Sequence, residues 1–195
     1  MTDPFDQEDK AATPLEDEER DGLIPSYVTT RGELNEAEQA NIIEAADWAF
    51  SRKRNVLNGQ FLDRLHHRMF RHVWKWAGRH RRTGKNVGVD AYKIPTELKR
   101  LIDDSQYWIT HESYLPDEIA ARFHHRLVWI HAYPNGNGRH ARLATDLLLK
   151  SLGRHPFSWG RINLVDAGET RQRYVEALRA ADRHDFELLN AFVRS

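Results

Sequence analysis

Apolar residues recur at intervals of three and four positions along most of the chain, and this period predicts helices. Proline and acidic residues at 116–118 suit the first turn of one of them, and Gly78 and Gly153 suit helix ends. The residues at helical spacing, all apolar except Asn41 and Ser105, are Leu34, Ala37, Asn41, Ala45 and Trp48; Phe61, Leu65, Met69, Val73 and Trp76; Leu98, Leu101, Ile102, Ser105 and Trp108; Ile119, Phe123, Leu127 and Ile130; Leu143, Leu147 and Leu148; Tyr174, Leu178 and Ala181; and Phe186, Leu189 and Phe192.

One segment, residues 83–95, departs from this period. Val87 and Val89 alternate around Gly88, and Gly84 and Asn86 supply turn residues. Alternation beside turn residues predicts a β-hairpin. The pattern as a whole therefore predicts an all-α bundle with a small β-hairpin flap.

The N-terminal residues differ in composition from the rest. Residues 1–22 are rich in Asp, Glu and Pro and nearly free of large apolar side chains, which predicts a flexible acidic leader before a domain at 23–195. They have no apolar core like that of a signal peptide, and no apolar run in the chain approaches the roughly 20 residues that span a bilayer. We expect a cytoplasmic protein with no membrane partner.

Charge and cysteine content exclude several kinds of site. The chain has 29 Lys and Arg against 29 Asp and Glu, a balance that argues against an electrostatic nucleic-acid binder. It has no cysteine, which excludes disulfides, thiolate metal sites and a cysteine nucleophile.

Residues 131–142, HAYPNGNGRHAR, join two predicted helices and carry candidate chemistry. His131 is a candidate proton acceptor, because an imidazole titrates near working pH. Gly136 and Gly138 allow a ligand to approach the backbone N–H groups closely. Those groups, with the start of the next helix, form an anion-binding concavity.

Arg139 and Arg142 complete this pattern. They lie three positions apart and so share one face of the helix. Two guanidinium groups beside a nest of N–H groups suit a polyphosphate. A base beside a phosphate cradle is equipment for phosphoryl or nucleotidyl transfer. The plain alternative is a Gly-rich turn with solvated arginines, and the number of matching residues disfavours it.

The segment resembles the signature loop of the Fic/DOC family, HxFx(D/E)GNGRxxR. The resemblance extends to LHHRMFRHVWKWAG at 65–78, to a flap at 86–89 and to the C-terminal helices, and covers roughly residues 20–195. The amino-acid sequence most resembles that of the bacterial subgroup called mobile mystery protein B. The resemblance implies a Fic-type helical bundle that transfers AMP from ATP to a Ser, Thr or Tyr hydroxyl of a protein target, or of the enzyme itself.

The resemblance also implies a role for each matching residue. His131 would deprotonate the target hydroxyl, and Gly136, Asn137 and Gly138 would hold the phosphates. Arg139 would contact the β-phosphate side and Arg142 the γ-phosphate. The flap residues would clamp the target's main chain as an added strand: Lys85, Asn86, Val87, Gly88 and Val89.

Two positions depart from the family pattern. Tyr133 replaces a Phe and is expected to pack inward. Asn135 replaces the acid that holds Mg²⁺, and an amide offers only a neutral oxygen. Mg²⁺ or Mn²⁺ would then be held mainly by the phosphates of ATP, with Asn135 as a weak nucleotide and metal ligand.

Residues 29–34, TTRGEL, resemble the inhibitory pattern (S/T)xxxE(G/N) of the family. In that interpretation Glu33 pairs with Arg142 and keeps the enzyme autoinhibited. In the other interpretation Thr29 or Thr30 caps the next helix and Glu33 completes a capping box. The sequence leaves both open.

Two further clusters have structural as well as functional interpretations. His66, His67, His72, His124 and His125 could hold a metal with an acid such as Asp63, but we favour core-satisfied or solvated histidines. The basic run 79–82 with Lys85 could contact an acidic target, but we favour a solvated rim.

Two functions from different classes remain. The first is a protein adenylyltransferase. The second is a Fic-fold protein that binds a nucleotide or partner and has lost turnover with Asn135. His131 favours the enzyme, because binding alone needs no base. The target, a regulatory partner and a homo-oligomeric state are left open by the sequence.

Overall fold

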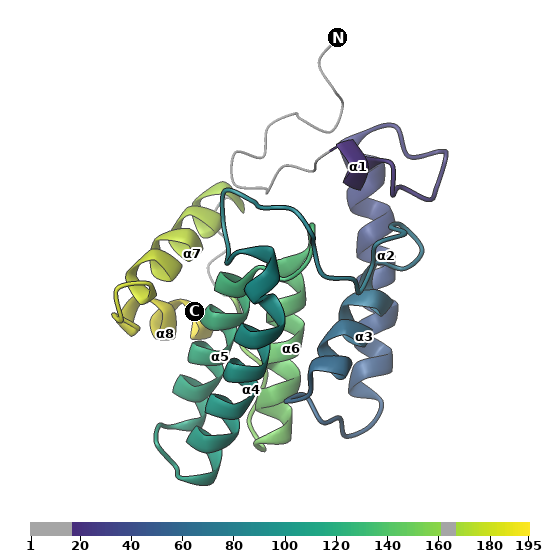
Figure 1. The fold of residues 1–195 in the computed structure, drawn as a ribbon. Helices are drawn as coiled ribbons and strands as arrows, with labels where there is room; N and C mark the ends of the chain where they lie inside the picture. The colour runs from purple at the N-terminus through teal and green to yellow at the C-terminus, as the bar shows by residue number, and fades with distance from the viewer. Residues whose placement is uncertain (1–16, 161–166) are drawn as a thin grey trace.

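The protein, seen in a computed structural model, is described over residues 17–160 and 167–195. These ranges form helices α1 (Asp17–Arg20), α2 (Arg31–Phe50), α3 (Gly59–Phe70), α4 (Ile94–Thr110), α5 (Pro116–Ile130), α6 (Asn137–Ser151), α7 (Ala167–Ala181) and α8 (Glu187–Arg194), with a 3-10 turn η1 (Ala91–Lys93). Helices α4, α5 and α6 stand side by side in the centre, α2 and α3 flank them on one side, and α7 and α8 on the other (Figure 1). The predicted all-α class is confirmed.

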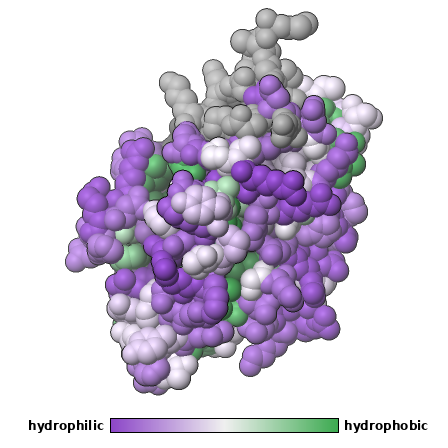
Figure 2. Space-filling view, viewed as in Figure 1, coloured by the Kyte–Doolittle hydropathy of each residue, from purple (hydrophilic) through white to green (hydrophobic). Residues whose placement is uncertain are grey.

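Two apolar clusters hold these helices together. The larger lies among α2, α3, α4, α5 and α6 and includes Leu34, Leu65 and Phe70. The smaller joins α5 and α6 to α7 and α8 through Phe157, Trp159, Tyr174, Leu189 and Phe192. The remaining surface is mostly polar, with small apolar areas between (Figure 2). Helices α5 and α6 contribute to both clusters, so the loop between them is fixed from both sides.

Local sequence signals start these helices as expected. Asn58 accepts a hydrogen bond from the backbone N–H of Phe61 at 2.9 Å and caps α3. Pro116 occupies the first turn of α5, followed by Asp117 and Glu118.

The second predicted helix ends earlier than its apolar stripe suggests. Helix α3 stops at Phe70, and Val73 and Trp76 lie in turns beyond it. There the N-terminal segment takes the backbone hydrogen bonds: the N–H of Ile24 donates to the carbonyl of Val73, and the N–H of Lys75 to that of Gly22. A helical spacing of side chains thus persists where the backbone pairs with another segment.

The predicted leader also needs correction at its C-terminal end. Residues 1–16 lie outside the described part of the chain. Residues 17–22, however, are docked on the domain through Glu19, which is buried. The Glu19 carbonyl accepts from the indole of Trp76 at 2.9 Å, and its carboxylate pairs with Lys85 at 2.5 Å. Acidic composition predicted flexibility because it could not reveal this cation.

The predicted β-hairpin is absent from the described residues, and the flap is an irregular loop that ends in η1. Its backbone groups find partners elsewhere. The N–H of Val89 lies 3.4 Å from the carbonyl of Ile130, and the carbonyls of Thr83 and Val89 accept from the Arg81 side chain. Bonds that a hairpin would make internally go to α5 and to one arginine.

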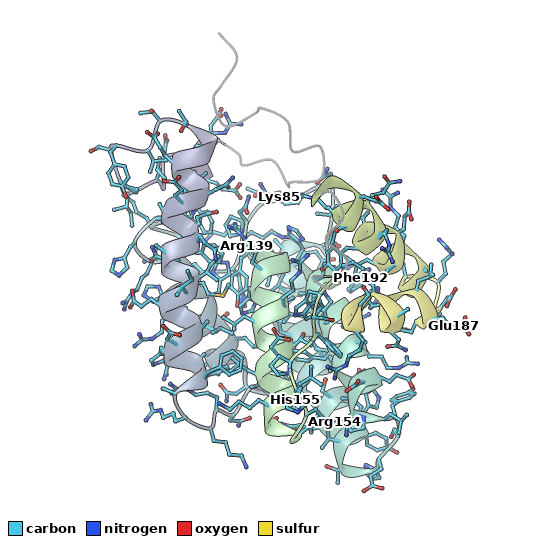
Figure 3. The ribbon with its side chains drawn as sticks, turned by 180° about the vertical axis from the view of Figure 1, so that it is seen from behind. Lys85, Arg139, Arg154, His155, Glu187 and Phe192 are labelled. Carbon is cyan, nitrogen blue, oxygen red and sulfur yellow. The ribbon has the colours of Figure 1, made fainter. Side chains whose placement is uncertain are left out.

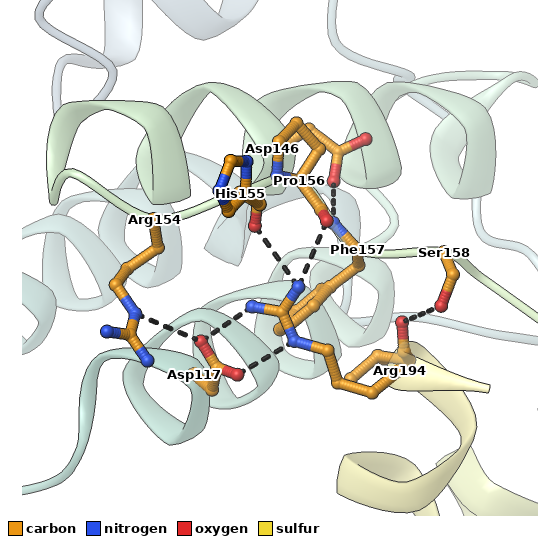
Figure 4. Close-up of polar contacts among 9 residues, drawn as sticks. Asp117, Asp146, Arg154, His155, Pro156, Phe157, Ser158 and Arg194 are labelled. Carbon is orange, nitrogen blue, oxygen red and sulfur yellow. Dashed lines mark hydrogen bonds and ion pairs between the residues drawn. The ribbon is translucent and has the colours of Figure 1, made fainter.

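The C-terminal helix is tied to α5 by a charged cluster (Figure 4). Arg194 pairs with Asp117 at 2.7 Å and also donates to the carbonyls of His155 and Pro156. These bonds hold α8 beside the start of α5. Of the described helices, none is both long and apolar enough to cross a membrane.

Candidate active site

The loop between α5 and α6 begins at His131, which is the residue after the last turn of α5 and has left-handed backbone angles, φ 53° and ψ 58°. One ring nitrogen donates to the carbonyl of Val128, which leaves the lone pair on the other nitrogen. Burial, with the cations of Arg81 and Lys85, lowers the pKa of His131 to about 4. His131 is therefore neutral near pH 7, the form that a general base needs.

The next part of the loop is held by the side chain of Asn137, to which the family resemblance gave a phosphate-binding role. The Asn137 side chain accepts from the N–H of Tyr133 at 2.9 Å and donates to its carbonyl at 2.8 Å. Tyr133 is only 1% exposed, stacks on His66 and donates to Asp63 at 2.8 Å. The inward packing expected of Tyr133 is confirmed, and the Asn137 amide serves the loop.

Asn135 and Gly136 form the tight turn before α6. The Asn135 side-chain oxygen accepts from the N–H of Gly136 at 2.6 Å, and its backbone carbonyl accepts from His66 at 3.0 Å. Gly136 has φ +78°, and a Cβ there would lie 2.5 Å from the Phe70 ring. Only glycine fits this position.

Helix α6 then begins without a side-chain cap, at Asn137. A Cβ built on Gly138 meets nothing within 4 Å, so the first turn opens on free space. Backbone N–H groups at an uncapped helix start favour an anion. The anion-binding concavity that the Asn-Gly pattern predicts would lie over this turn.

Arg139 lies at this end of α6, the same end of the bundle as Lys85 (Figure 3). Its guanidinium donates to Glu38 of α2 at 2.6 Å. Glu38 is 3% exposed and also accepts from the Trp74 indole at 2.7 Å. A nucleotide phosphate would have to share Arg139 with this carboxylate.

Arg142, three positions farther along α6, reaches toward α7, whereas Arg139 reaches toward α2. Its guanidinium lies 4.7 Å from the centre of the Tyr174 ring and hydrogen-bonds the Tyr174 hydroxyl, which also lies 2.8 Å from His124. Its Nε is buried and has no hydrogen-bond partner among the described residues. An unsatisfied donor of this kind is a reason to expect a ligand oxygen.

Glu33 makes the capping interactions of the second interpretation. Its carboxylate accepts from the N–H groups of Thr29 and Thr30 at 2.8 and 2.9 Å, and Thr30 accepts from the Glu33 N–H. The expected Glu33–Arg142 ion pair is wrong, because each of these side chains has other partners. These hydrogen bonds hold the pKa of Glu33 below its usual value.

The histidine clusters serve the core and the surface. His66 and His124 are buried, and burial lowers the pKa of both well below the usual value for histidine, to about 3 for His124. His125 pairs with Asp182 at 2.8 Å. Across residues 17–160 and 167–195, no group of three or more His, Cys, Asp or Glu is placed to hold a metal. Asn135 adds only a neutral oxygen that already accepts an N–H, so these residues do not fit a resident Mg²⁺.

Sequence reasoning missed three residues of the site: Arg81, Glu38 and Tyr174. Arg81 was assigned to a solvated rim, yet it is 3% exposed and holds three carbonyls of the flap and loop. Three arginines and a histidine in sequence do not reveal which one points inward. Glu38 and Tyr174 lie on ordinary helical stretches, and no pattern distinguishes them.

Comparison with known proteins shows a family domain in this chain. Residues 56–149 match the sequence model of the Fic/DOC family. The chain contains a Fic/DOC domain. It is 35% identical over 125 residues to the protein adenylyltransferase fic-1 of Caenorhabditis elegans, covering 60% of this chain and 22% of that protein. It is 32% identical over 134 residues to the protein adenylyltransferase Fic of Drosophila grimshawi, covering 67% and 26%.

Solved Fic structures have the same fold. A BepC protein of Bartonella tribocorum, solved with bound AMPPNP, superposes with a TM-score of 0.68 at 18% identity, covering 92% of this chain and 97% of that one. Fic-1 of Caenorhabditis elegans gives 0.67 at 23%, covering 89% and 51%. The chain spans about a quarter of the length of the curated relatives it matches. The Fic/DOC domain accounts for the bundle and for the loop at 131–142.

Proposed function

We propose that this protein is a Fic-type adenylyltransferase, which transfers AMP from ATP to a hydroxyl of a protein target or of itself. The observation that carries the proposal is a neutral histidine, His131, one loop away from the open, uncapped start of α6. The curated relatives are named protein adenylyltransferases, and neighbouring Fic structures hold AMPPNP or ADP. A base beside an anion cradle fits that reaction.

In the proposed reaction the target hydroxyl oxygen attacks the α-phosphorus of ATP. Its proton passes to the ring nitrogen of His131 that carries the lone pair. A bond forms between that oxygen and the α-phosphorus, and the bond from the α-phosphorus to the bridging oxygen breaks. Pyrophosphate leaves with that electron pair, and Arg139 and Arg142 stabilise its charge.

The helix start and the flap position the two substrates. The N–H groups of Asn137 and Gly138 hold the phosphates, joined by that of Gly136 when it exchanges the Asn135 side-chain oxygen for a phosphate oxygen. The flap at Lys85–Val89, with Asn86 and Val87 exposed, is the surface on which the target's main chain would lie. Mg²⁺ or Mn²⁺ belongs to the proposal only as part of the metal–ATP substrate.

Several finer features belong to the same proposal. They are the mobile mystery protein B subgroup, a bacterial source, a cytoplasmic location, a regulatory partner or homo-oligomer, and an autoinhibited resting state. The assignment to this subgroup is supported only by the resemblance of the amino-acid sequence. Because Glu33 caps α2, the restraint proposed for the resting state is the Glu38–Arg139 ion pair, not a contact of Glu33.

The test compares ATP labelled at the α-phosphate with ATP labelled at the γ-phosphate. The unmodified protein, His131→Ala and His125→Ala would each be incubated with a cell lysate. Relative to the lysate alone, whose kinases transfer the γ-phosphate, we expect added α-label but no added γ-label with the unmodified protein and with His125→Ala, which changes an α5 histidine paired with Asp182. Added γ-label, or added α-label that survives in His131→Ala, would contradict the proposal.

A third outcome would favour the binding-module alternative. If calorimetry measured ATP binding while no protein acquired label in any sample, Asn135 would mark a silent relative. Asn135 is the specific observation behind that alternative, because it supplies no charged metal ligand.

A further inference from the structure

Arg81 connects the flap to the loop that carries His131. Its side chain donates from three nitrogens to three backbone carbonyls: Nε to His131 at 2.7 Å, Nη1 to Thr83 at 2.8 Å, and Nη2 to Val89. Its own backbone N–H donates to the carbonyl of Ala132 at 2.9 Å. At 3% exposure this guanidinium is shielded from solvent, so its bonds compete little with water.

The position of these carbonyls explains why an arginine is required. His131 follows the last turn of α5, where carbonyls lack helical partners and the helix dipole attracts a cation. A guanidinium offers five donors in a rigid fork, whereas an ammonium offers a point charge on a flexible stem. Only the fork reaches the two flap carbonyls and that of His131 together.

The flap itself lies directly against His131. A Cβ built on Gly88, which has φ +91°, would come within 2.5 Å of the Cβ of His131 and 2.9 Å of an Arg81 nitrogen. The backbone of the flap and the base therefore share one contact, and Arg81 spans it. Any target main chain that lay on the flap would be placed relative to His131 through this guanidinium.

We propose that Arg81 is a positioning residue, which sets the distance and orientation between the flap and His131 for transfer. The inference rests on the proposed function for its catalytic consequence, but its structural part does not. A displacement of about 1 Å at a reacting group costs about 100-fold in rate. Arg81 also contributes to the low pKa of His131, together with Lys85, whose ammonium pairs with Glu19.

The experiment separates the fork of Arg81 from its charge with three variants. Arg81→Met removes both, Arg81→Lys keeps the charge, and Arg82→Met removes an exposed neighbour as the control. Two readouts need no activity: hydrogen exchange of the flap amides at 83–90, and the NMR titration of His131. The third readout is the pH dependence of kcat and KM for AMP transfer to a protein that acquires α-label in the lysate test.

We expect flap exchange to rise about tenfold or more in Arg81→Met and Arg81→Lys. The pKa of His131 should rise above about 4 in Arg81→Met, while burial, the larger cause of the shift, keeps the pKa below its usual value; in Arg81→Lys the pKa should stay low. For transfer, kcat should fall about 100-fold in both variants while the KM for ATP changes little, because the phosphate cradle is intact. Arg82→Met should match the unmodified protein in flap exchange and in His131 titration.

If Arg81→Met does not fold, Gly88→Ala gives a second route, because its Cβ pushes the flap off His131 with Arg81 intact. It should raise flap exchange and lower kcat in the same way. Unchanged flap exchange and unchanged kcat in Arg81→Lys would overturn the inference. If the unmodified protein transfers no AMP, the proposed function fails, while exchange and titration still decide the role of Arg81.

Discussion

Two glycines of the loop sit in opposite surroundings, and this gives a matched pair of single-residue tests. Gly136→Ala would place a Cβ 2.5 Å from Phe70 at φ +78°, and we expect it to lower the free energy of unfolding by about 1–3 kcal/mol. Gly138→Ala meets nothing within 4 Å and should keep or raise stability by about 0.5–1 kcal/mol. Urea denaturation measures both.

Nucleotide binding should separate the same two variants further. The methyl group of Gly138→Ala fills space over the first turn of α6, where a phosphate would approach the N–H groups. We therefore expect weaker ATP binding by calorimetry in a stable protein. ATP affinity equal to that of the unmodified chain would show that the nucleotide does not use this turn.

Asn135 decides how the protein handles a metal. Asn135→Asp adds a charged oxygen at the position where the family pattern has an acid, and hard cations prefer such ligands. AMP transfer should rise by about tenfold and need less Mg²⁺, as measured by label incorporation against metal concentration. The same gain in Asn135→Ser, which adds no charge, would contradict this explanation.

At the residue scale, side-chain type predicted the site better than it predicted individual roles. The candidate residues stand out because they lie together within twelve positions of the sequence: His131, Gly136, Gly138, Arg139 and Arg142. The Asn137 amide was assigned to phosphate and instead holds Tyr133, since a nearby backbone can satisfy the same groups. Arg81 escaped detection because its partners are carbonyls, which carry no sequence signature.

At the scale of elements, helix starts were predictable and the flap was not. A proline or Asn cap acts within one turn, so Asn58 and Pro116 start their helices as expected. The flap's alternation of Val87 and Val89 predicted a hairpin, but its hydrogen bonds go to α5 and Arg81, which are distant in sequence. Long-range partners of backbone groups were not readable from local pattern.

The start of α2 offers a test of the two interpretations of Glu33. Thr30→Ala removes the N-cap and should cost about 1 kcal/mol of stability. Glu33→Gln should lower the melting temperature slightly and leave AMP transfer unchanged, because its carboxylate accepts from Thr29 and Thr30. A large rise in transfer in Glu33→Gln, absent in Thr30→Ala, would restore the inhibitory interpretation.

Helix α2 also reaches α6 through the Glu38–Arg139 ion pair, at 2.6 Å. Glu38→Gln keeps an acceptor for the Trp74 indole and removes the charge that holds Arg139. We expect about tenfold tighter ATP binding by calorimetry, with a loss of about 1–3 kcal/mol in stability. The control is Glu44→Gln. Glu44 also lies on α2, and its substitution breaks an exposed ion pair with Arg71, which follows α3. Unchanged or weaker ATP binding in Glu38→Gln would show that Arg139 does not need release.

At the scale of the whole molecule, periodicity predicted the bundle because its two cores collect the apolar stripes of successive helices. The stripe positions Leu34, Leu65 and Leu101 are buried in the larger core, and Tyr174, Leu189 and Phe192 in the smaller. Periodicity did not predict that the apolar residues divide into two separate cores. The same helix pair, α5 and α6, must face both cores, and this depends on which residues lie on each side of a helix once it is packed.

Three buried histidines and the partly buried His131 make the stability of this bundle sensitive to acid. Burial lowers the pKa of His66 well below its usual value, of His124 to about 3, and of His131 and His140 to about 4. The unfolded chain binds protons at these positions near pH 6.5 and the folded chain does not, so stability is fully present above that pH. It is lost as pH falls toward 4, at about 1.4 kcal/mol per pH unit for each histidine.

Urea denaturation at pH 7.5, 6 and 5 would measure this loss. Replacing one of the four, in His140→Gln, should reduce the slope by about 1.4 kcal/mol per pH unit between pH 6 and 5. His155→Gln, the same substitution at an exposed position, is the matched control. A free energy of unfolding that stays level from pH 7.5 to 5 would mean that these histidines are protonated in the folded protein. His131 would then titrate near pH 6.5, as in the unfolded chain, and AMP transfer would fall below that pH as the base becomes protonated.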